Sequence, residues 1–206
     1  VSFTSWGISL YYSKNNTILG NIANNNSYGI KLIHSNMTRI MSNIVNNIGS
    51  DAIHLFRSNN NAIFENSINN TDHNGITSFR SNNSIISGNT LSNIYYEGID
   101  LRNSYNNTIF KNIANIISLR DSYNNTITEN HARIILRTSD NNIVLGNKAN
   151  QNNWYGITVY YSNNNTISGN IANYNYAGIR LDQSYNNTIS GNILKNNVYG
   201  IQLAAS

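Results

Sequence analysis

Three arginines recur at nearly regular spacing in the middle of this 206-residue sequence: Arg102, Arg120 and Arg137. Guanidinium groups bind carboxylates and sulfates through paired hydrogen bonds, so such a row predicts a strip that recognises anionic groups. Two acids, Glu97 and Asp100, precede the first arginine. They are weak candidates for general acid–base catalysis, which needs two groups within reach of one bond.

Aromatic residues flank the arginines in the sequence. Tyr95 and Tyr96 come before the row, and Trp154 and Tyr155 come after it. Aromatic rings offer large flat surfaces with a polar tip, which suits stacking against a sugar. Together with the arginines, they predict a binding site for an anionic glycan.

A solvated ladder of Arg–Asp pairs is the structural alternative to that site. Stacked cations repel one another unless acids or an anion offset them, and the nearest acids are Asp100, Asp121 and Asp140. Such a charged ladder would also discourage lateral pairing between sheets.

A repeat must position all these residues. The motif G-I-x-L-x-x-S-x-N-N-x-I-x-x-N recurs along the whole chain, and its first position, the anchor, falls at Gly7, Gly29, Ala52, Gly75, Gly98, Ile116, Arg133, Gly156, Gly178 and Gly200. The anchors are 22 or 23 residues apart, except for intervals of 18 and 17 residues after Gly98 and Ile116. Ile follows every anchor, Ser lies six residues after it, and Asn lies fourteen residues after it in every full copy.

The repeat predicts a parallel β-helix. Apolar and polar residues alternate over very short runs rich in β-branched side chains, which is the strand period. A copy of 22–23 residues holds three such strands and three corners, and stacked copies pair each strand with its counterpart at about 4.8 Å. Inward Asn can stack as an amide ladder, and Gly and Asn accept positive φ at corners. Pro, which would remove ladder donors, is absent.

Several phrases carry a family resemblance: the runs 104–109 (SYNNTI), 184–189 (SYNNTI) and 164–170 (NNTISGN). The chain resembles the right-handed parallel β-helix superfamily, in particular the short-repeat group of NosD-like, so-called periplasmic copper-binding, repeats and related archaeal surface proteins. The resemblance implies one all-β domain over residues 1–206, a single-stranded right-handed parallel β-helix. The repeat spacing predicts about nine coils of 22–23 residues, with two shortened coils of 17–18.

The shortened copies predict a notch across the rod around residues 95–155. Aligned by column, they lose about five residues just before the next anchor. Elsewhere that corner is rich in Asn and aromatic residues. We expect Tyr95 and Tyr96 on one wall and Trp154 and Tyr155 on the other. The floor is expected to consist of outward side chains, among them Asp100 and the three arginines.

Catalysis at the notch is the alternative function. The resemblance implies that β-helix lyases and hydrolases use clustered Asp, often with calcium, or an Arg or Lys base. This chain has only nine Asp and Glu residues, spread over ten copies. No cofactor is expected, but calcium bound through Asp100 or Asp121 stays open.

Copper, which the NosD name implies, is poorly supplied with ligands. The chain has no Cys and two Met, and its four His are dispersed over four copies: His34, His54, His73 and His131. His54 and His73 lie near Asp51 and Asp72 in the sequence, but in different columns. We therefore expect surface histidines rather than a metal site.

Composition excludes other classes. Asn accounts for 46 of the 206 residues, while Cys is absent and charged residues make up 11%. Without Cys, disulfides, thiol catalysis and Cys-ligated zinc are excluded. No apolar run approaches the roughly 18–20 residues that span a bilayer, so direct membrane insertion is not expected. The net charge of +4 is modest, and Lys and Arg are too dispersed for a nucleic-acid groove.

The sequence thus predicts an extracellular or cell-surface structural or adhesive module. Its expected partners are an anionic glycan or other copies of itself. The alternative is a polysaccharide lyase or glycoside hydrolase acting at the notch. The end coils lack a recognisable cap. This fits a fragment of a longer surface protein, ends that meet neighbouring copies, or a covering element of unfamiliar sequence.

Overall fold

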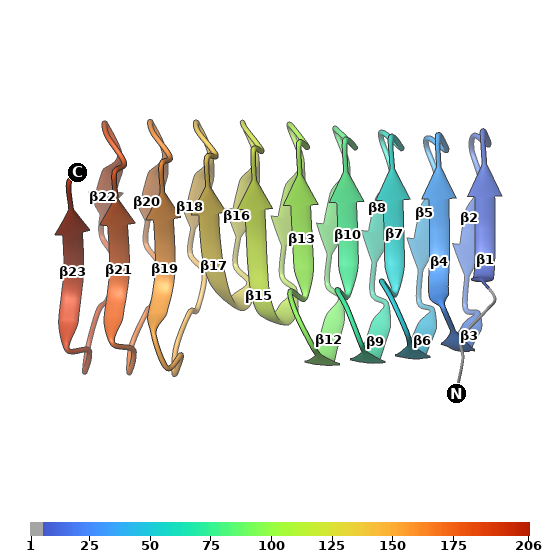
Figure 1. The fold of residues 1–206 in the computed structure, drawn as a ribbon, viewed down its shortest axis with the longest axis horizontal. Helices are drawn as coiled ribbons and strands as arrows, with labels where there is room; N and C mark the ends of the chain where they lie inside the picture. Colours follow the sequence, from blue (N-terminus) through green and yellow to red (C-terminus); the bar gives the residue numbers. More distant parts are fainter. Residues whose placement is uncertain (1–5) are drawn as a thin grey trace.

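The computed structural model describes residues 6–206, which form a right-handed parallel β-helix (Figure 1). The strands stack side by side along the long axis, and each pairs in parallel with its counterparts in the neighbouring coils. Within the described part of the chain, no helix is long and apolar enough to cross a membrane. The predicted fold class is confirmed.

Each coil begins with a strand on what we call its first side. These strands are β1 Trp6–Tyr11, β4 Tyr28–Ile33, β7 Ile53–Phe56, β10 Ile76–Phe79, β13 Ile99–Arg102, β15 Ile113–Arg120, β17 His131–Arg137, β19 Tyr155–Tyr160, β21 Ala177–Asp182 and β23 Tyr199–Ala204. The second side consists of β2 Thr17–Leu19, β5 Arg39–Met41, β8 Ala62–Phe64, β11 Ile85–Ser87, β14 Thr108–Phe110, β16 Thr126–Thr128, β18 Ile143–Leu145, β20 Thr166–Ser168 and β22 Thr188–Ser190. The third side has β3 Ile22–Asn26, β6 Ile44–Ile48, β9 Ser67–Thr71 and β12 Thr90–Ile94.

The inward Ile columns form the core, as the repeat predicts. On the first side, Ile30, Ile53 and Ile76 pair in register and are fully buried. Ile99 pairs with Ile117, which pairs with Ile134. The stacking therefore continues unbroken through both shortened coils.

A ladder of Asn amides runs along the rod beside the core. Its members, fourteen residues after each anchor, are Asn21, Asn43, Asn66, Asn89, Asn112, Asn130, Asn147, Asn170 and Asn192. Asn89 represents them: its Nδ2 donates to the Oδ1 of Asn112 (3.0 Å), and its own Oδ1 accepts from the Nδ2 of Asn66 (2.9 Å). Each coil thus satisfies buried polar groups of its neighbours, and the predicted ladder is confirmed.

The corners use left-handed backbone at fixed positions. Asn occupies most of one such column, as expected, for example Asn60 (φ 57°) and Asn83 (φ 55°). Another column, five residues after each anchor, departs from the expectation because it holds large side chains such as Arg57 (φ 49°) and the β-branched Thr138 (φ 47°). The repeat imposes this conformation whatever residue stands there.

The shortened coils merge two sides of the rod. β15 pairs with β13 through Ile117 and with β12 through Ile113, so it joins the first and third sides in one sheet. Figure 1 shows β15 and β17 as long curved strands where the other coils turn through a separate corner. No residue between Lys111 and Asp121 has positive φ, because the five missing residues contained that corner.

Candidate functional site

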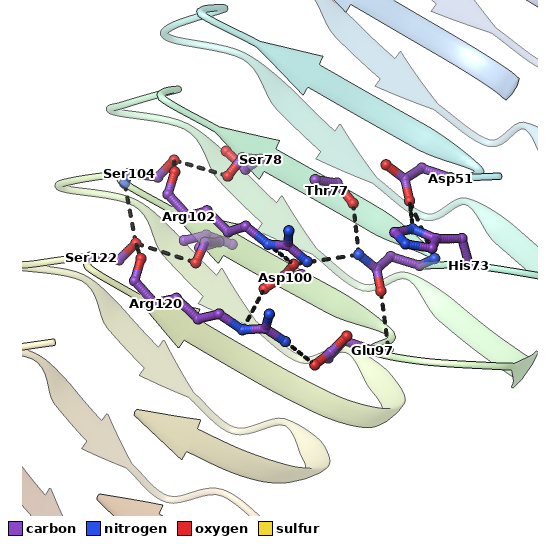
Figure 2. A network of polar contacts seen from close by, with 12 residues as sticks. Asp51, His73, Thr77, Ser78, Glu97, Asp100, Arg102, Ser104, Arg120 and Ser122 are labelled. Carbon is purple, nitrogen blue, oxygen red and sulfur yellow. Dashed lines mark hydrogen bonds and ion pairs between the residues drawn. The ribbon is translucent and has the colours of Figure 1, made fainter. Parts of the chain in front are cut away.

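Polar side chains of consecutive coils meet on the outer surface of the first side (Figure 2). They border a pocket of about 340 Å³, which we call the imidazole pocket. It is lined by Tyr28, Ser50, Asp51, His54, His73, Asn74, Thr77, Phe79 and Arg102. Since these residues come from four successive coils, the stacking register alone brings them together.

Asp51 holds two imidazoles at once. The Nδ1 of His54 lies 2.7 Å from its Oδ2, and the Nδ1 of His73 lies 2.5 Å from its Oδ1. Asp51 is buried, and the backbone N–H of Asn74 also donates to its Oδ1. Burial raises the pKa of Asp51, but the hydrogen bonds and charges of the two histidines outweigh burial and leave that pKa below its ordinary value.

The ionised carboxylate fixes the tautomer of both histidines. Asp51 has no proton to donate, so each Nδ1 must carry the hydrogen of the contact. In a neutral imidazole, Nε2 then keeps its lone pair and can accept a proton. The side chain of His73 is 44% exposed and that of His54 is 17% exposed, so His73 is the more accessible base.

The side-chain amide of Asn74 connects this group to a second charged cluster. Its Nδ2 donates to the Oγ1 of Thr77 (3.2 Å) and to the Oδ2 of Asp100 (3.4 Å). Its Oδ1 accepts from the backbone N–H of Glu97 (3.1 Å). The network in Figure 2 therefore extends from Asp51 to the arginines of the shortened coils.

Asp100 was expected at an outward position on the notch floor, where a catalytic acid would be accessible. It does lie on the outer surface of β13, yet it is fully buried. Arg102 covers it, with Nε 2.5 Å from its Oδ2, and the Nε of Arg120 lies 3.9 Å from its Oδ1. Complete burial raises the pKa of Asp100 above its ordinary value, and the two guanidinium groups offset only part of that rise.

The predicted arginine column is present. Arg102 pairs in register with Arg120, and Arg120 pairs with Arg137. Their repulsion is offset by Asp100 and by Glu97, whose Oε1 forms an ion pair with Nη2 of Arg120.

Asp121 and Asp140, the other acids considered for this role, form no ion pair within residues 6–206. The structure thus contains the Arg–acid contacts of the structural alternative at Arg102 and Arg120. Arg137 is exposed, and a binding role for the column stays a prediction.

The four aromatic residues predicted as walls of the notch pack in two groups. Tyr96 packs edge-on against His73, with ring centroids 5.2 Å apart, and Tyr95 packs on Tyr96. Trp154 lies beside Tyr155, whose hydroxyl accepts a hydrogen bond from Arg180. A cavity does lie over the shortened coils, but none of these four aromatic residues lines it.

The convergence of His54 and His73 on Asp51 was missed from the sequence. Asp51 lies one residue before its anchor, and His54 lies two residues after that anchor. His73 lies two residues before the anchor of the next coil. Comparing adjacent columns on adjacent coils, rather than identical columns, would have placed the three residues together.

Comparisons with known proteins agree with the fold. The family profile described as "Periplasmic copper-binding protein (NosD)" matches residues 1–120 and 117–206. No curated protein matches the chain in sequence.

Solved structures of several carbohydrate enzymes superpose on the chain. A mutant of the periplasmic alginate epimerase AlgG has a TM-score of 0.73 at 20% identity, covering 86% of this chain and 50% of that one. DFA-IIIase from Arthrobacter chlorophenolicus A6 without its lid has a TM-score of 0.69 at 14% identity, and the match covers 82% of this chain and 52% of that one. An alginate lyase from Paenibacillus sp. str. FPU-7 has a TM-score of 0.61 at 15% identity, and the match covers 97% of this chain and 76% of that one. The chain spans about half the length of the first two, and these identities show a shared fold.

Copper is the metal in the family description, and the residues present do not fit a copper centre. Within residues 6–206, no three His, Cys, Asp or Glu side chains are grouped so that they could hold a metal ion. The Nδ1 atoms of His54 and His73 are both occupied by Asp51. Cu(I) would also favour sulfur ligands, and the chain has no Cys and only two Met.

Proposed function

The chain belongs to the NosD family, and from that premise we propose that it acts on an acidic polysaccharide in the cell envelope or outside the cell. The word "periplasmic" describes both the family and the alginate epimerase that shares the fold. It supports an envelope or extracellular location, while the finer placement at the cell surface stays a prediction.

The observation that carries the proposal is the presence of a base and an anion receptor in one pocket. His73 presents an imidazole whose Nδ1 is held by Asp51, and Arg102 lines the same pocket. The Nε of Arg102 is bound to Asp100, and its terminal nitrogens form no hydrogen bond within the described part of the chain. Those two nitrogens match the geometry of a carboxylate.

This pair suits a uronic acid residue of a polysaccharide. A uronate carries its carboxylate next to C-5, and the hydrogen on C-5 becomes removable when the carboxylate charge is neutralised. In this proposal Arg102 binds the carboxylate and stabilises the negative charge that develops on it. The Nε2 of His73 removes the C-5 proton, and Asp51 stabilises the imidazolium that results.

Two outcomes follow from the same proton abstraction. If the bond from C-4 to its oxygen breaks, that oxygen takes a proton and a C-4–C-5 double bond forms, which is a lyase reaction. If a proton returns to C-5 from the opposite face, the product is the epimer. Tyr28 lines the same pocket and carries a hydroxyl that can supply the proton in either case.

Deuterium exchange tests the proposal. The protein is incubated in D₂O with a panel of polyuronates, and nuclear magnetic resonance follows deuterium at C-5 while ultraviolet absorbance follows unsaturated products. Exchange should fall by about 100-fold or more in His73→Gln, because a general base contributes at least that much. The control is His34→Gln, whose ring stacks on Tyr12 (4.8 Å) outside the pocket. Absence of exchange with every polyuronate would contradict the catalytic proposal.

Binding without turnover is the second candidate, favoured by the arginine column. Arg120 is 31% exposed and Arg137 is exposed, so an acidic chain can lie along them. A structural or adhesive module would bind the same polyuronates through Arg102, Arg120 and Arg137 and leave C-5 unlabelled. Self-association through other copies of the chain stays a prediction, and size-exclusion chromatography with light scattering would test it.

A further inference from the structure

A second cavity lies over the shortened coils, and its lining differs from that of the imidazole pocket. We call it the short-coil cavity; its volume is about 380 Å³. It is lined by Ala114, Asn115, His131, Ala132, Arg133, Lys148, Asn150, Gln151 and Asn152. The cavity occupies the side on which the corner before the anchor is missing from two consecutive coils.

Basic side chains gather in this cavity without acidic partners. His131 and Lys148 are neighbours on adjacent coils, and Arg133 lies two residues beyond His131 on the same outward surface of β17. No Asp or Glu lines the cavity. Among residues 6–206, none of these three basic side chains forms an ion pair.

The nearby arginine column shows how the fold offsets the charge of stacked cations with acidic side chains. There, Asp100 lies under Arg102, and Glu97 pairs with Arg120. Cations about 5 Å apart repel one another, so acids are placed to offset them. The short-coil cavity brings Arg133 and Lys148 together without that compensation.

Arg133, which lines this cavity, has an unsatisfied donor. Its Nε is buried and has no hydrogen-bond partner in the described part of the chain. Burial lowers the pKa of Arg133, with a smaller contribution from Arg137, while Tyr155 and Tyr160 act in the opposite direction. A buried donor without a partner is costly, so an acceptor anion that drew the guanidinium toward the cavity would be favoured.

We propose that the short-coil cavity is an oxyanion-binding site, in which Arg133 and Lys148 hold a sulfate, carboxylate or phosphate group. The site is separate from the imidazole pocket and does not depend on the chemistry proposed there. Its lining is mostly polar side chains, which suits a small hydrated anion or one acidic group of a polymer.

Titration calorimetry at constant ionic strength tests the site with two probes, inorganic sulfate and a short oligogalacturonate. Arg133→Gln/Lys148→Gln should weaken binding of the recognised probe by about tenfold or more, since charge-assisted hydrogen bonds are lost. The single variant Lys148→Gln changes only an exposed side chain, so it tests the site without endangering the fold. Arg39→Gln/Lys195→Gln removes the same charge elsewhere on the surface and should bind like the wild type.

The two probes also distinguish the sources of the anion. If the oligomer binds far more tightly than sulfate and the double variant loses that advantage, the occupant is an acidic group of a polymer. If both probes bind equally and both weaken, the occupant is a free anion. Equal affinities of the wild type and the cavity variants for both probes would overturn the proposal. Sulfate has no C-5 proton to lose, so the sulfate titration tests the cavity independently of the proposed reaction.

Discussion

Asn74 donates a hydrogen bond of 3.4 Å from its Nδ2 to the Oδ2 of Asp100, which lies 26 residues further along the chain. Through its backbone N–H, Asn74 also binds Asp51. One residue therefore links two buried carboxyl groups whose pKa values are displaced in opposite directions. The pKa of Asp51 is lowered, and that of Asp100 is raised.

The two carboxyl groups should give opposite pH dependences of stability. With a folded-state pKa below its unfolded value of about 3.9, Asp51 stabilises the fold above that pH and loses this contribution as the pH falls through the folded pKa. The stability advantage of the wild type over Asp51→Asn should therefore shrink in acid. Asp100, with a raised pKa, contributes stability below its unfolded pKa and loses it as the pH rises through the folded pKa.

Urea unfolding of Asp51→Asn and Asp100→Asn across the acidic range measures both effects. The difference from wild type should change with pH in opposite directions for the two variants. If the stability differences of both variants changed with pH in the same direction, the opposite pKa shifts of Asp51 and Asp100 would be contradicted. Asp140→Asn serves as the control, because Asp140 forms no ion pair among the described residues.

Arg102→Lys should separate recognition of the carboxylate from proton abstraction. Lysine keeps the charge over Asp100 but lacks the planar pair of donors, so KM for a polyuronate should rise by about tenfold. Arg57→Lys is the matched control, since Arg57 lies over Phe56 (5.2 Å) and does not line the imidazole pocket. An unchanged KM in Arg102→Lys, measured by C-5 exchange, would argue against the carboxylate contact.

Asn89→Ala should destabilise the rod by about 3 kcal/mol, because several buried groups lose their partners. The amide of Asn89 donates to the carbonyl groups of Ile63 (3.0 Å) and Ser87 (3.1 Å) as well as to Asn112. Asn153→Ala is the control, since Asn153 is exposed, and it should change stability by less than about 0.5 kcal/mol. If urea unfolding showed equal losses of unfolding free energy for Asn89→Ala and Asn153→Ala, the ladder would contribute no more than an exposed Asn.

Thr138→Asn should stabilise the protein. Thr138 is β-branched and has φ 47°, a conformation that costs an L-residue about 1–2 kcal/mol and that Asn adopts more readily. The expected gain in unfolding free energy is about 1 kcal/mol. Thr166→Asn, at an exposed strand position, should show no gain because Asn is disfavoured in strands. A gain of similar size at both positions would indicate a surface effect instead.

The fold could be predicted from the sequence because each coil repeats one rule. Ile after the anchor and Asn fourteen residues after it are buried in every interior coil, as at Ile76 and Asn89, so period and pairing follow directly. The register of the first side also survives the shortened coils, and the pairing of β15 with β17 shifts by one residue only between Ile113 and Ile116. What the repeat did not reveal is that the backbone is left-handed at the column that contains Thr138 and Arg57.

The site was harder to predict, because it depends on side chains that cross between columns. Outward direction did not mean exposure at Asp100, since Arg102 folds over it from the next outward position of the same strand. His73 reaches Asp51 from the neighbouring coil, a contact that a comparison within single columns does not reveal. A hollow at the shortened coils was predicted from the sequence, but the basic side chains that line the cavity there were not.

The Asn ladder described above points one way. In every pair it is the earlier coil that donates, as from Asn66 to Asn89 and from Asn89 to Asn112, so all the side-chain carbonyl oxygens point toward earlier coils. A shorter row on the same pattern, from Asn107 to Asn125 and from Asn125 to Asn142, has the same direction. Aligned amide dipoles add, as they do along an α-helix. The buried ladder is therefore electrically polar, negative toward its earlier coils and positive toward its later ones, while an exposed row from Asn70 to Asn47 and from Asn47 to Asn25 runs in the opposite direction.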